Sequence, residues 1–265
     1  MKQQNKVAIV TGGAMGYKSG GASIGGAISI QLAKDGYSVV VVDLEEMGNR
    51  TVEIIKKNNG NALFIKADVT KTEDVKKIVD TAEKQFGGIH ALVNCVAKYG
   101  SGMAKSVVDI EEKDWNKVID VNLNGYFKMC KYTIPVMKKG GTGAIVNISS
   151  VAAFTVLPNF SIYSVTKAAI FALTRTMAVY YAPIIRANAV CPGFVKIANS
   201  ENNRTVEQLT AWYKDISKQY PMKRVCEVEE IANVVSFLAS DKASYINGQS
   251  IIVDGGKMVA DTHDF

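Results

Sequence analysis

The sequence predicts an α/β fold in which a doubly wound parallel sheet of about seven strands carries helices on both faces. One indication is a series of short apolar runs, rich in β-branched residues, that do not alternate with polar residues, as in strands covered on both sides. Another is that segments with helical spacing lie between these runs, which requires right-handed βαβ crossovers. The predicted strands are residues 7–10, 38–42, 62–65, 91–93, 144–148, 186–190 and 250–253.

The predicted helices follow the strands in chain order. The first begins within the stretch Ala22–Ile28 and runs on to Lys34, and the repeat of apolar residues from Val75 to Phe86 at helical spacing predicts another after the third strand. Two longer helices are expected after the fourth and fifth strands, at residues 114–138 and 161–181. No internal repeat, low-complexity tract or linker divides the chain, so residues 1–265 are expected to form a single domain.

Composition and charge exclude several classes of protein. The net charge of +6 comes from scattered positive residues, whereas a nucleic-acid binder usually concentrates them in a patch. Four cysteines without a CxxC pair and only two histidines argue against a zinc site or a disulfide scaffold and favour a reducing, cytoplasmic location. No secretory signal is visible, and the uncharged stretch 140–166 is too polar to span a bilayer, so no membrane partner is expected.

A glycine-rich segment joins the first strand to the first helix, with glycines at positions 12, 13, 16, 20, 21, 25 and 26. A pyrophosphate needs helix N-terminal N–H groups and glycines that allow close approach, so this segment predicts a dinucleotide site in a single Rossmann-fold domain. Asp43 ends the second strand 18 residues after Gly25, where an acidic side chain bonds the adenosine ribose and repels a 2′-phosphate. NAD is therefore the expected cofactor and NADP the less favoured one.

Further motifs follow in order along essentially the whole chain. They are Asp68-Val69-Thr70, Asp120-Val121-Asn122-Leu123, Asn147-Ile148-Ser149-Ser150, Tyr163-Ser164-Val165-Thr166-Lys167, Cys191-Pro192-Gly193, Phe237-Leu238-Ala239-Ser240-Asp241 and Val253-Asp254-Gly255-Gly256. Each is weak alone, but the ordered set resembles the short-chain dehydrogenase/reductase family, including its catalytic serine and its YxxxK signature.

This resemblance implies an oxidoreductase that interconverts an alcohol and its carbonyl compound with NAD or NADP. It implies four catalytic residues, which are Asn122, Ser150, Tyr163 and Lys167. The cofactor-binding residues it implies are Gly12, Ser23, Ile24, Asp43, Asp68, Val69, Asn94, Tyr163, Lys167, Pro192, Gly193 and Val195. No metal is implied, and family members are commonly tetramers that pair the two long helices, so a homotetramer or homodimer is expected.

The pairing of tyrosine and lysine carries a physical argument of its own. A phenol with a pKa of about 10 is too weakly acidic to act as a base at neutral pH. Tyr163 and Lys167 are four positions apart, hence on one face of a helix, and a cation within about 4–6 Å favours the phenolate. Tyr163 is thus the candidate general base for oxidation and general acid for reduction. By the resemblance, Ser150 holds the substrate oxygen, Lys167 also anchors the nicotinamide ribose, and Asn122 holds a water of the proton relay.

Several positions depart from the family pattern. Residues 15–21 form an insertion in the glycine loop, either a surface bulge or a flap near the cofactor, and Ser23 stands where the middle glycine is expected. Lys18 is a possible partner of a 2′-phosphate, which keeps NADP open. After the fourth strand only Asn94 matches the family's NNAG stretch, and Ile197 replaces the threonine that often touches the carboxamide.

The substrate is less defined by the sequence. The segment 194–225, which carries Trp212 and Tyr213, is expected either to cover the substrate as a lid or to pack onto the domain.

A similarity around Tyr180 to microbial aldose dehydrogenases favours a sugar or polyol. The alternatives are a 3-oxoacyl-thioester reductase using NADPH and, from another class, a catalytically silent NAD(P)-sensing protein. An enoyl-thioester reductase would place a lysine at position 170, which is Ile170. The residues expected to line the pocket are Tyr99, Val151, Ala152, Phe154, Phe160 and Phe194.

Overall fold

A seven-stranded parallel sheet forms the centre of the molecule, in the order β3-β2-β1-β4-β5-β6-β7. The computed structural model describes residues 6–16, 23–98, 106–155, 160–198 and 204–260. All seven predicted strands are present, and the predicted α/β class with a doubly wound sheet is confirmed. The strands are β1 (Val7–Thr11), β2 (Ser38–Asp43), β3 (Asn61–Lys66), β4 (Ala91–Asn94), β5 (Gly143–Ile148), β6 (Ile185–Pro192) and β7 (Ser250–Val253).

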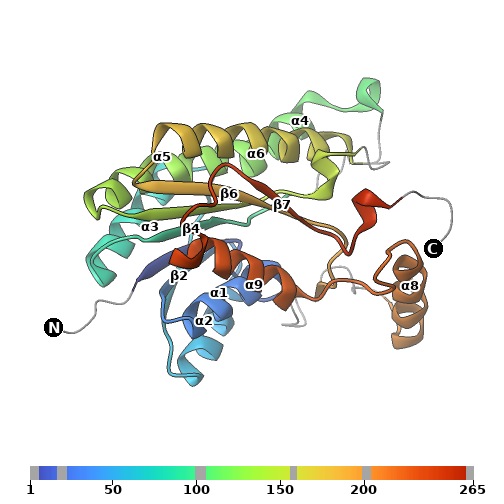
Figure 1. The fold of residues 1–265 in the computed structure, drawn as a ribbon, viewed down its shortest axis with the longest axis horizontal. Coiled ribbons are helices and arrows are strands. Elements are labelled where there is room, and N and C mark those ends of the chain that lie inside the picture. The colour runs from blue at the N-terminus through green and yellow to red at the C-terminus, as the bar shows by residue number, and fades with distance from the viewer. Residues whose placement is uncertain (1–5, 17–22, 99–105, 156–159, 199–203, 261–265) are drawn as a thin grey trace.

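Helices cover both faces of the sheet, as Figure 1 shows. One face carries α1 (Ile24–Lys34), α2 (Gly48–Lys57) and α9 (Val228–Ala239), and the other carries α3 (Thr72–Phe86), α4 (Glu112–Ile119), α5 (Gly125–Lys139) and α6 (Ser161–Tyr180). Each face has its own apolar core, because the strands between them are buried on both sides. None of the helices within the described residues has the length and apolar character needed to cross a membrane.

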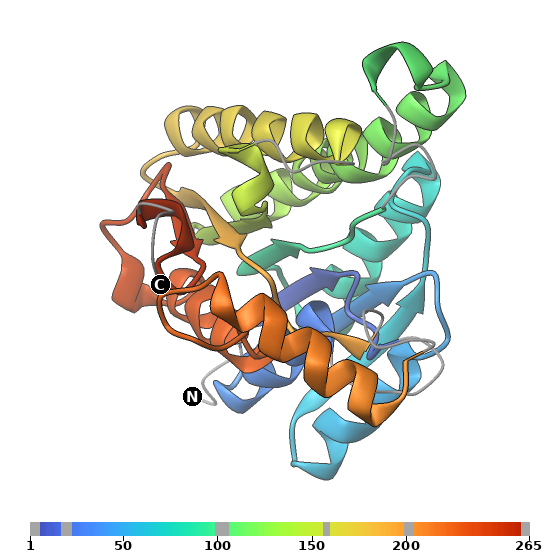
Figure 2. The same cartoon turned by 90° about the vertical axis from the view of Figure 1, so that its right-hand side faces the viewer.

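The carboxyl ends of the strands form the edge at which the predicted site lies. The chain runs from β1 outward to β3 and then returns to β4 on the other side of β1, so the strand order reverses between β1 and β4. Ligands of open α/β sheets bind in the crevice at such a reversal. Helix α8 (Val206–Lys218) stands apart at this end of the sheet, and Figure 2 shows it crossing the front of the molecule.

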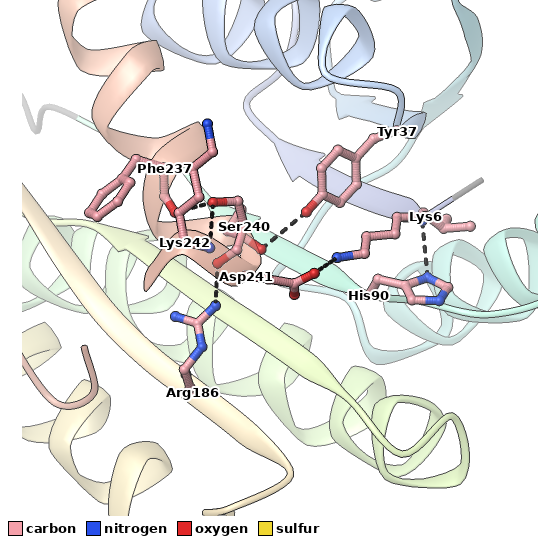
Figure 3. A network of polar contacts seen from close by, with 10 residues as sticks. Lys6, Tyr37, His90, Arg186, Phe237, Ser240, Asp241 and Lys242 are labelled. Atoms are coloured by element: carbon pink, nitrogen blue, oxygen red, sulfur yellow. Dashed lines mark hydrogen bonds and ion pairs between the residues drawn. The ribbon is translucent and has the colours of Figure 1, made fainter. Parts of the chain in front are cut away.

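The other end of the sheet, where the strands begin, is closed by a polar network (Figure 3). Arg186 donates from Nη2 to a carbonyl oxygen at the end of α9 at 3.0 Å, and the Tyr37 hydroxyl donates to another at 3.0 Å. Lys6 pairs with Asp241 at 2.7 Å, and His90 accepts the first backbone N–H of β1 through Nδ1 at 3.0 Å. The bonds of Arg186 and Tyr37 cap α9, and the Lys6–Asp241 ion pair ties the turn after α9 to the start of β1.

One predicted helix differs in the structure. The sequence predicts a continuous helix over 114–138, but α4 and α5 are separated by a π-helical turn at Asp120–Asn124. The apolar periodicity does not show this break, because the helical direction continues through the turn. The turn carries Asn122, and π-turns within helices are frequent at functional sites.

Candidate active site

The glycine-rich segment begins with two close backbone contacts. Gly12 has a φ of +66°, and a Cβ there would lie 2.9 Å from the backbone of Val96. A Cβ on Gly25 would lie 1.9 Å from the carbonyl oxygen of Gly12. Only glycine fits either position, and together they draw the start of α1 against the ends of β1 and β4.

The hydroxyl group of Ser23 holds the end of this segment. Ser23 caps α1, accepting the Gly26 N–H at 3.0 Å and donating to the Ala14 carbonyl at 2.6 Å. Ser23 thus acts as a helix cap where the family has a glycine. The amides of Ile24 and Gly25 donate to no other residue within the described part of the chain, so the first turn of α1 offers them to a phosphate. This arrangement fits the pyrophosphate of a dinucleotide.

Asp43 lies at the end of β2 beside the same segment. Its carboxylate accepts the backbone N–H groups of Ala14 and Glu45, both at 3.1 Å. Burial raises the pKa of this carboxyl above its ordinary value, and the backbone N–H groups oppose that shift. The side chain therefore fixes the glycine segment to β2 and is half-buried, a position that fits an adenosine ribose.

Two further predicted cofactor residues follow β3. The Asp68 carboxylate accepts the backbone N–H and the hydroxyl of Thr70, at 2.9 and 2.7 Å, and so shapes the turn into α3. Val69 is buried against α5, where a Cβ on Gly125 would lie 2.7 Å from it.

Asn94 is placed differently from the other cofactor candidates. Its side chain is fully buried and donates to Asn147 Oδ1 at 2.9 Å, and Asn147 in turn donates to Thr174 at 3.0 Å. The amide of Asn94 therefore ties β4 to β5 and, through Asn147, to α6 inside the molecule.

Tyr163 and Lys167 face each other on α6, as the spacing predicts. The Lys167 ammonium lies 5.3 Å from the centre of the Tyr163 ring and donates to the Ile148 carbonyl at 2.7 Å. Both side chains are buried, with Lys167 only 1% exposed. Burial lowers the pKa of Lys167 to about 8. The structure thus brings the phenol and the cation together at the carboxyl end of β5.

Ser150 and Asn122 complete the predicted set. Ser150 follows β5, caps a short 3-10 turn by accepting the Ala152 N–H at 3.1 Å, and is half-buried. Asn122 is buried, accepts the Lys98 N–H at 2.7 Å, and donates to the Lys98 carbonyl at 3.1 Å and to Thr166 at 3.3 Å. Asn122 thereby joins the π-turn to α6 one residue before Lys167.

The segment after β6 holds the remaining candidates. Pro192 ends β6, and the Gly193 N–H donates to Val253 of β7 at 2.9 Å. A Cβ on Gly193 would lie 3.0 Å from the side chain of Asp254, which keeps this turn close to β7. Val195 forms an isolated parallel bridge with Cys226, so both ends of the proposed lid are tied together.

Aromatic side chains hold the described part of the segment 194–225. Phe194 lies edge-on to Trp212 at 5.2 Å, and its backbone N–H donates to the Tyr220 hydroxyl at 3.0 Å. Trp212 therefore packs α8 onto the segment that follows β6.

The candidates Lys18 and Tyr99, and most of the insertion 15–21, lie outside the described residues.

The structure adds two residues that the sequence did not single out. Thr51 of α2 is fully buried, donates to the Gly13 carbonyl at 3.0 Å and accepts the Met15 N–H at 3.0 Å. Tyr126 of α5 is also fully buried, and its ring lies 5.5 Å from the Lys167 ammonium. The only sequence signal for Tyr126 is its place four residues after Asn122, on the same side of the helix.

Comparisons with known proteins agree with this geometry. Residues 20–257 match the family model described as enoyl-(acyl carrier protein) reductase. An uncharacterized oxidoreductase of Thermotoga maritima is 38% identical over 264 residues, which are 97% of this chain and 98% of that protein. The 3-oxoacyl-acyl-carrier-protein reductase FabG of Staphylococcus epidermidis is 36% identical over 259 residues, 95% of this chain and 98% of that protein.

A solved structure is similar over nearly the full length. The ligand-free aldohexose dehydrogenase of Thermoplasma acidophilum superimposes with a TM-score of 0.86 at 32% identity, covering 99% of this chain and 97% of that chain.

Proposed function

Because this chain belongs to the short-chain dehydrogenase/reductase family of oxidoreductases, which act on CH–OH or carbonyl groups, we propose that it interconverts a secondary alcohol, such as a sugar or polyol, and its carbonyl compound with NAD. The observation that carries this proposal is the Lys167 ammonium 5.3 Å from the Tyr163 ring, at the carboxyl end of β5 beside Ser150. A buried cation beside the phenol ring favours the phenolate that the reaction needs.

Each catalytic side chain has a distinct part in oxidation. The Tyr163 phenolate accepts the hydroxyl proton as the carbon–oxygen double bond forms. The Ser150 hydroxyl donates to the substrate oxygen and stabilises the charge that develops there. Lys167 favours the phenolate form of Tyr163, and Asn122 fixes the π-turn and holds the water through which the proton leaves. When bound, NAD supplies the acceptor for the hydride.

The proposed cofactor site is the crevice between β1 and β4. Gly12, Ser23 and Ile24 would receive the pyrophosphate at the start of α1, and Asp43 the adenosine ribose. Asp68 and Val69 would border the adenine, while Asn94, Pro192, Gly193 and Val195 would border the nicotinamide half. Asp43 favours NAD, since its carboxylate would repel a 2′-phosphate.

Replacing Tyr163 with Phe tests the mechanism. The Tyr163→Phe protein should reduce NAD at less than about 1% of the wild-type rate, because a positioned acid–base group contributes about 10²–10⁴-fold. Its affinity for NAD, measured by fluorescence titration, should stay within about threefold of wild type. Unchanged turnover would refute the assigned base. Catalytic silence of the wild type across a broad panel of alcohols would favour the NAD-sensing alternative.

A second candidate function is reduction of 3-oxoacyl thioesters with NADPH, which the 36% identity to the staphylococcal FabG favours. The aldohexose dehydrogenase likeness favours a sugar or polyol instead. Ile170 stands where enoyl-thioester reductases carry a lysine, which disfavours that third reaction. A panel of aldoses, polyols, simple secondary alcohols and 3-oxoacyl thioesters, each with both cofactors, distinguishes these substrates.

The cofactor is tested separately from the substrate. Wild type should have a lower Kd for NAD than for NADP. In Asp43→Ala the ratio of these two Kd values should decrease by about tenfold or more. A wild-type preference for NADP would overturn the assignment and favour the thioester reductase.

We also propose that the chain forms a dimer or tetramer through α5 and α6. Phe127 on α5 and Val179 and Tyr180 on α6 are exposed apolar residues on these helices. Sedimentation of the purified protein as a monomer would refute this.

A further inference from the structure

Lys167 is a buried cation without an anionic partner in the described part of the chain. None of the ion pairs found there involves it, and the Ile148 carbonyl at 2.7 Å is a neutral acceptor. Apart from tyrosine, the titratable groups on other elements that act on its charge are the thiols of Cys95, after β4, and Cys191, on β6. Burial raises the pKa of both thiols to about 12, so both are uncharged at neutral pH.

Two tyrosine rings take the place of a counter-ion. The Lys167 ammonium lies 5.3 Å from the ring centre of Tyr163 and 5.5 Å from that of Tyr126, which comes from α5. Both distances are within the roughly 6 Å over which a ring face attracts a cation, and the attraction strengthens when water is excluded. Tyr126 is fully buried, so its ring meets this condition.

The hydroxyl of Tyr126 acts on the same carbonyl that Lys167 uses. It lies 3.1 Å from the Ile148 carbonyl oxygen and 3.1 Å from the Val96 carbonyl oxygen, so it bridges the ends of β5 and β4. A carbonyl oxygen has two lone pairs, which suffice for both the phenol and the ammonium. The acceptor that orients Lys167 is therefore itself held in place by Tyr126.

We propose that Tyr126 is a positioning residue of this site: its ring keeps Lys167 in the charged form, and its hydroxyl fixes the carbonyl that aims Lys167 at Tyr163. The inference rests on the proposed function. It adds to the four expected catalytic residues a fifth side chain that acts through Lys167, without touching the substrate.

Two variants separate the two effects. Tyr126→Phe keeps the ring and removes the hydroxyl, so the Lys167 pKa should stay within about half a unit of wild type while kcat falls about fivefold, the worth of a hydrogen bond. Tyr126→Leu removes ring and hydroxyl but remains apolar, so the Lys167 pKa should fall by about one unit. Tyr132→Phe is the matched control, because Tyr132 lies on the same helix and its ring contacts the surface cations Lys76 and Lys131.

The direct readout is NMR titration of lysines labelled at the side-chain nitrogen, with Lys167→Met to assign the signal. This measurement needs no turnover, so it tests Tyr126 even if the substrate assignment fails. The pH profile of kcat/KM is the second readout. Its acidic limb should move to higher pH in Tyr126→Leu, because a smaller fraction of Lys167 is charged and the phenolate is stabilised less.

A Lys167 titration in Tyr126→Leu equal to that of wild type would overturn the inference. So would a loss of activity that follows lower thermal stability in both variants without any change in the pH profile, since that is the signature of packing alone. If Tyr126→Leu does not fold, a Tyr126→Phe protein with wild-type kcat would also overturn it.

Discussion

Replacing Thr51 with Val tests how the glycine segment is held. Valine has nearly the same shape, but it removes the hydroxyl that accepts the Met15 N–H and donates to the Gly13 carbonyl, both at 3.0 Å. A buried polar group left without a partner costs about 1–3 kcal/mol, and the Gly13 carbonyl contact is buried while that of Met15 is partly so. We expect a loss of about 2 kcal/mol in the free energy of unfolding.

The same change should weaken cofactor binding, because the loosened segment must be ordered when the dinucleotide binds. A cost of about 0.8–1 kcal/mol corresponds to a Kd for NAD about fivefold higher. Urea unfolding and fluorescence titration measure the two effects. Thr176→Val is the control, since the Thr176 hydroxyl donates to the Ala172 carbonyl in an exposed part of α6, away from the glycine segment. Wild-type stability and affinity in Thr51→Val would refute this account of the segment.

Two other perturbations have equally defined outcomes. Gly25→Ala places a Cβ 1.9 Å from the Gly12 carbonyl oxygen, so the protein should lose NAD binding or fail to fold. Gly88→Ala is the control and should behave as wild type, because the Cβ there would approach a His90 side-chain atom at 3.7 Å, an ordinary contact distance. Burial, and secondly the charge of Lys6, lowers the pKa of His90 in the folded protein below its ordinary 6.5. Neutral His90 therefore stabilises the fold fully above pH 6.5, and this contribution is lost as the pH falls through the folded pKa. The urea midpoint should therefore decrease with falling pH, and it should do so less in His90→Asn, which carries no titratable side chain.

The sheet was predictable because strands buried on both faces leave continuous apolar runs, as in Val39 to Val42. The pairing of Tyr163 with Lys167 was predictable for a similar reason, since the spacing of four residues fixes a shared helix face. Asp43 was predictable because it ends the second strand 18 residues after Gly25, and that strand lies beside the first.

Other features depend on contacts that no local pattern records. The π-turn at Asn122 is stabilised by bonds to Lys98 and Thr166, which are distant in sequence. Thr51 and Tyr126 occupy ordinary helical positions, and only the packing of α2 and α5 against the strand ends gives them their partners. Asn94 matched the family motif, yet its amide is directed into the core because Asn147 is opposite it in the paired strand.

The most direct measurement of the central claim is the pH dependence of kcat/KM for alcohol oxidation in wild type and in Lys167→Met. We expect wild-type activity to rise well below pH 10, the ordinary range of a phenol, because the buried Lys167 cation favours the Tyr163 phenolate. In Lys167→Met the residual activity should rise only toward pH 10. An acidic limb at the same pH in both proteins would contradict the claim that a buried cation makes Tyr163 the base.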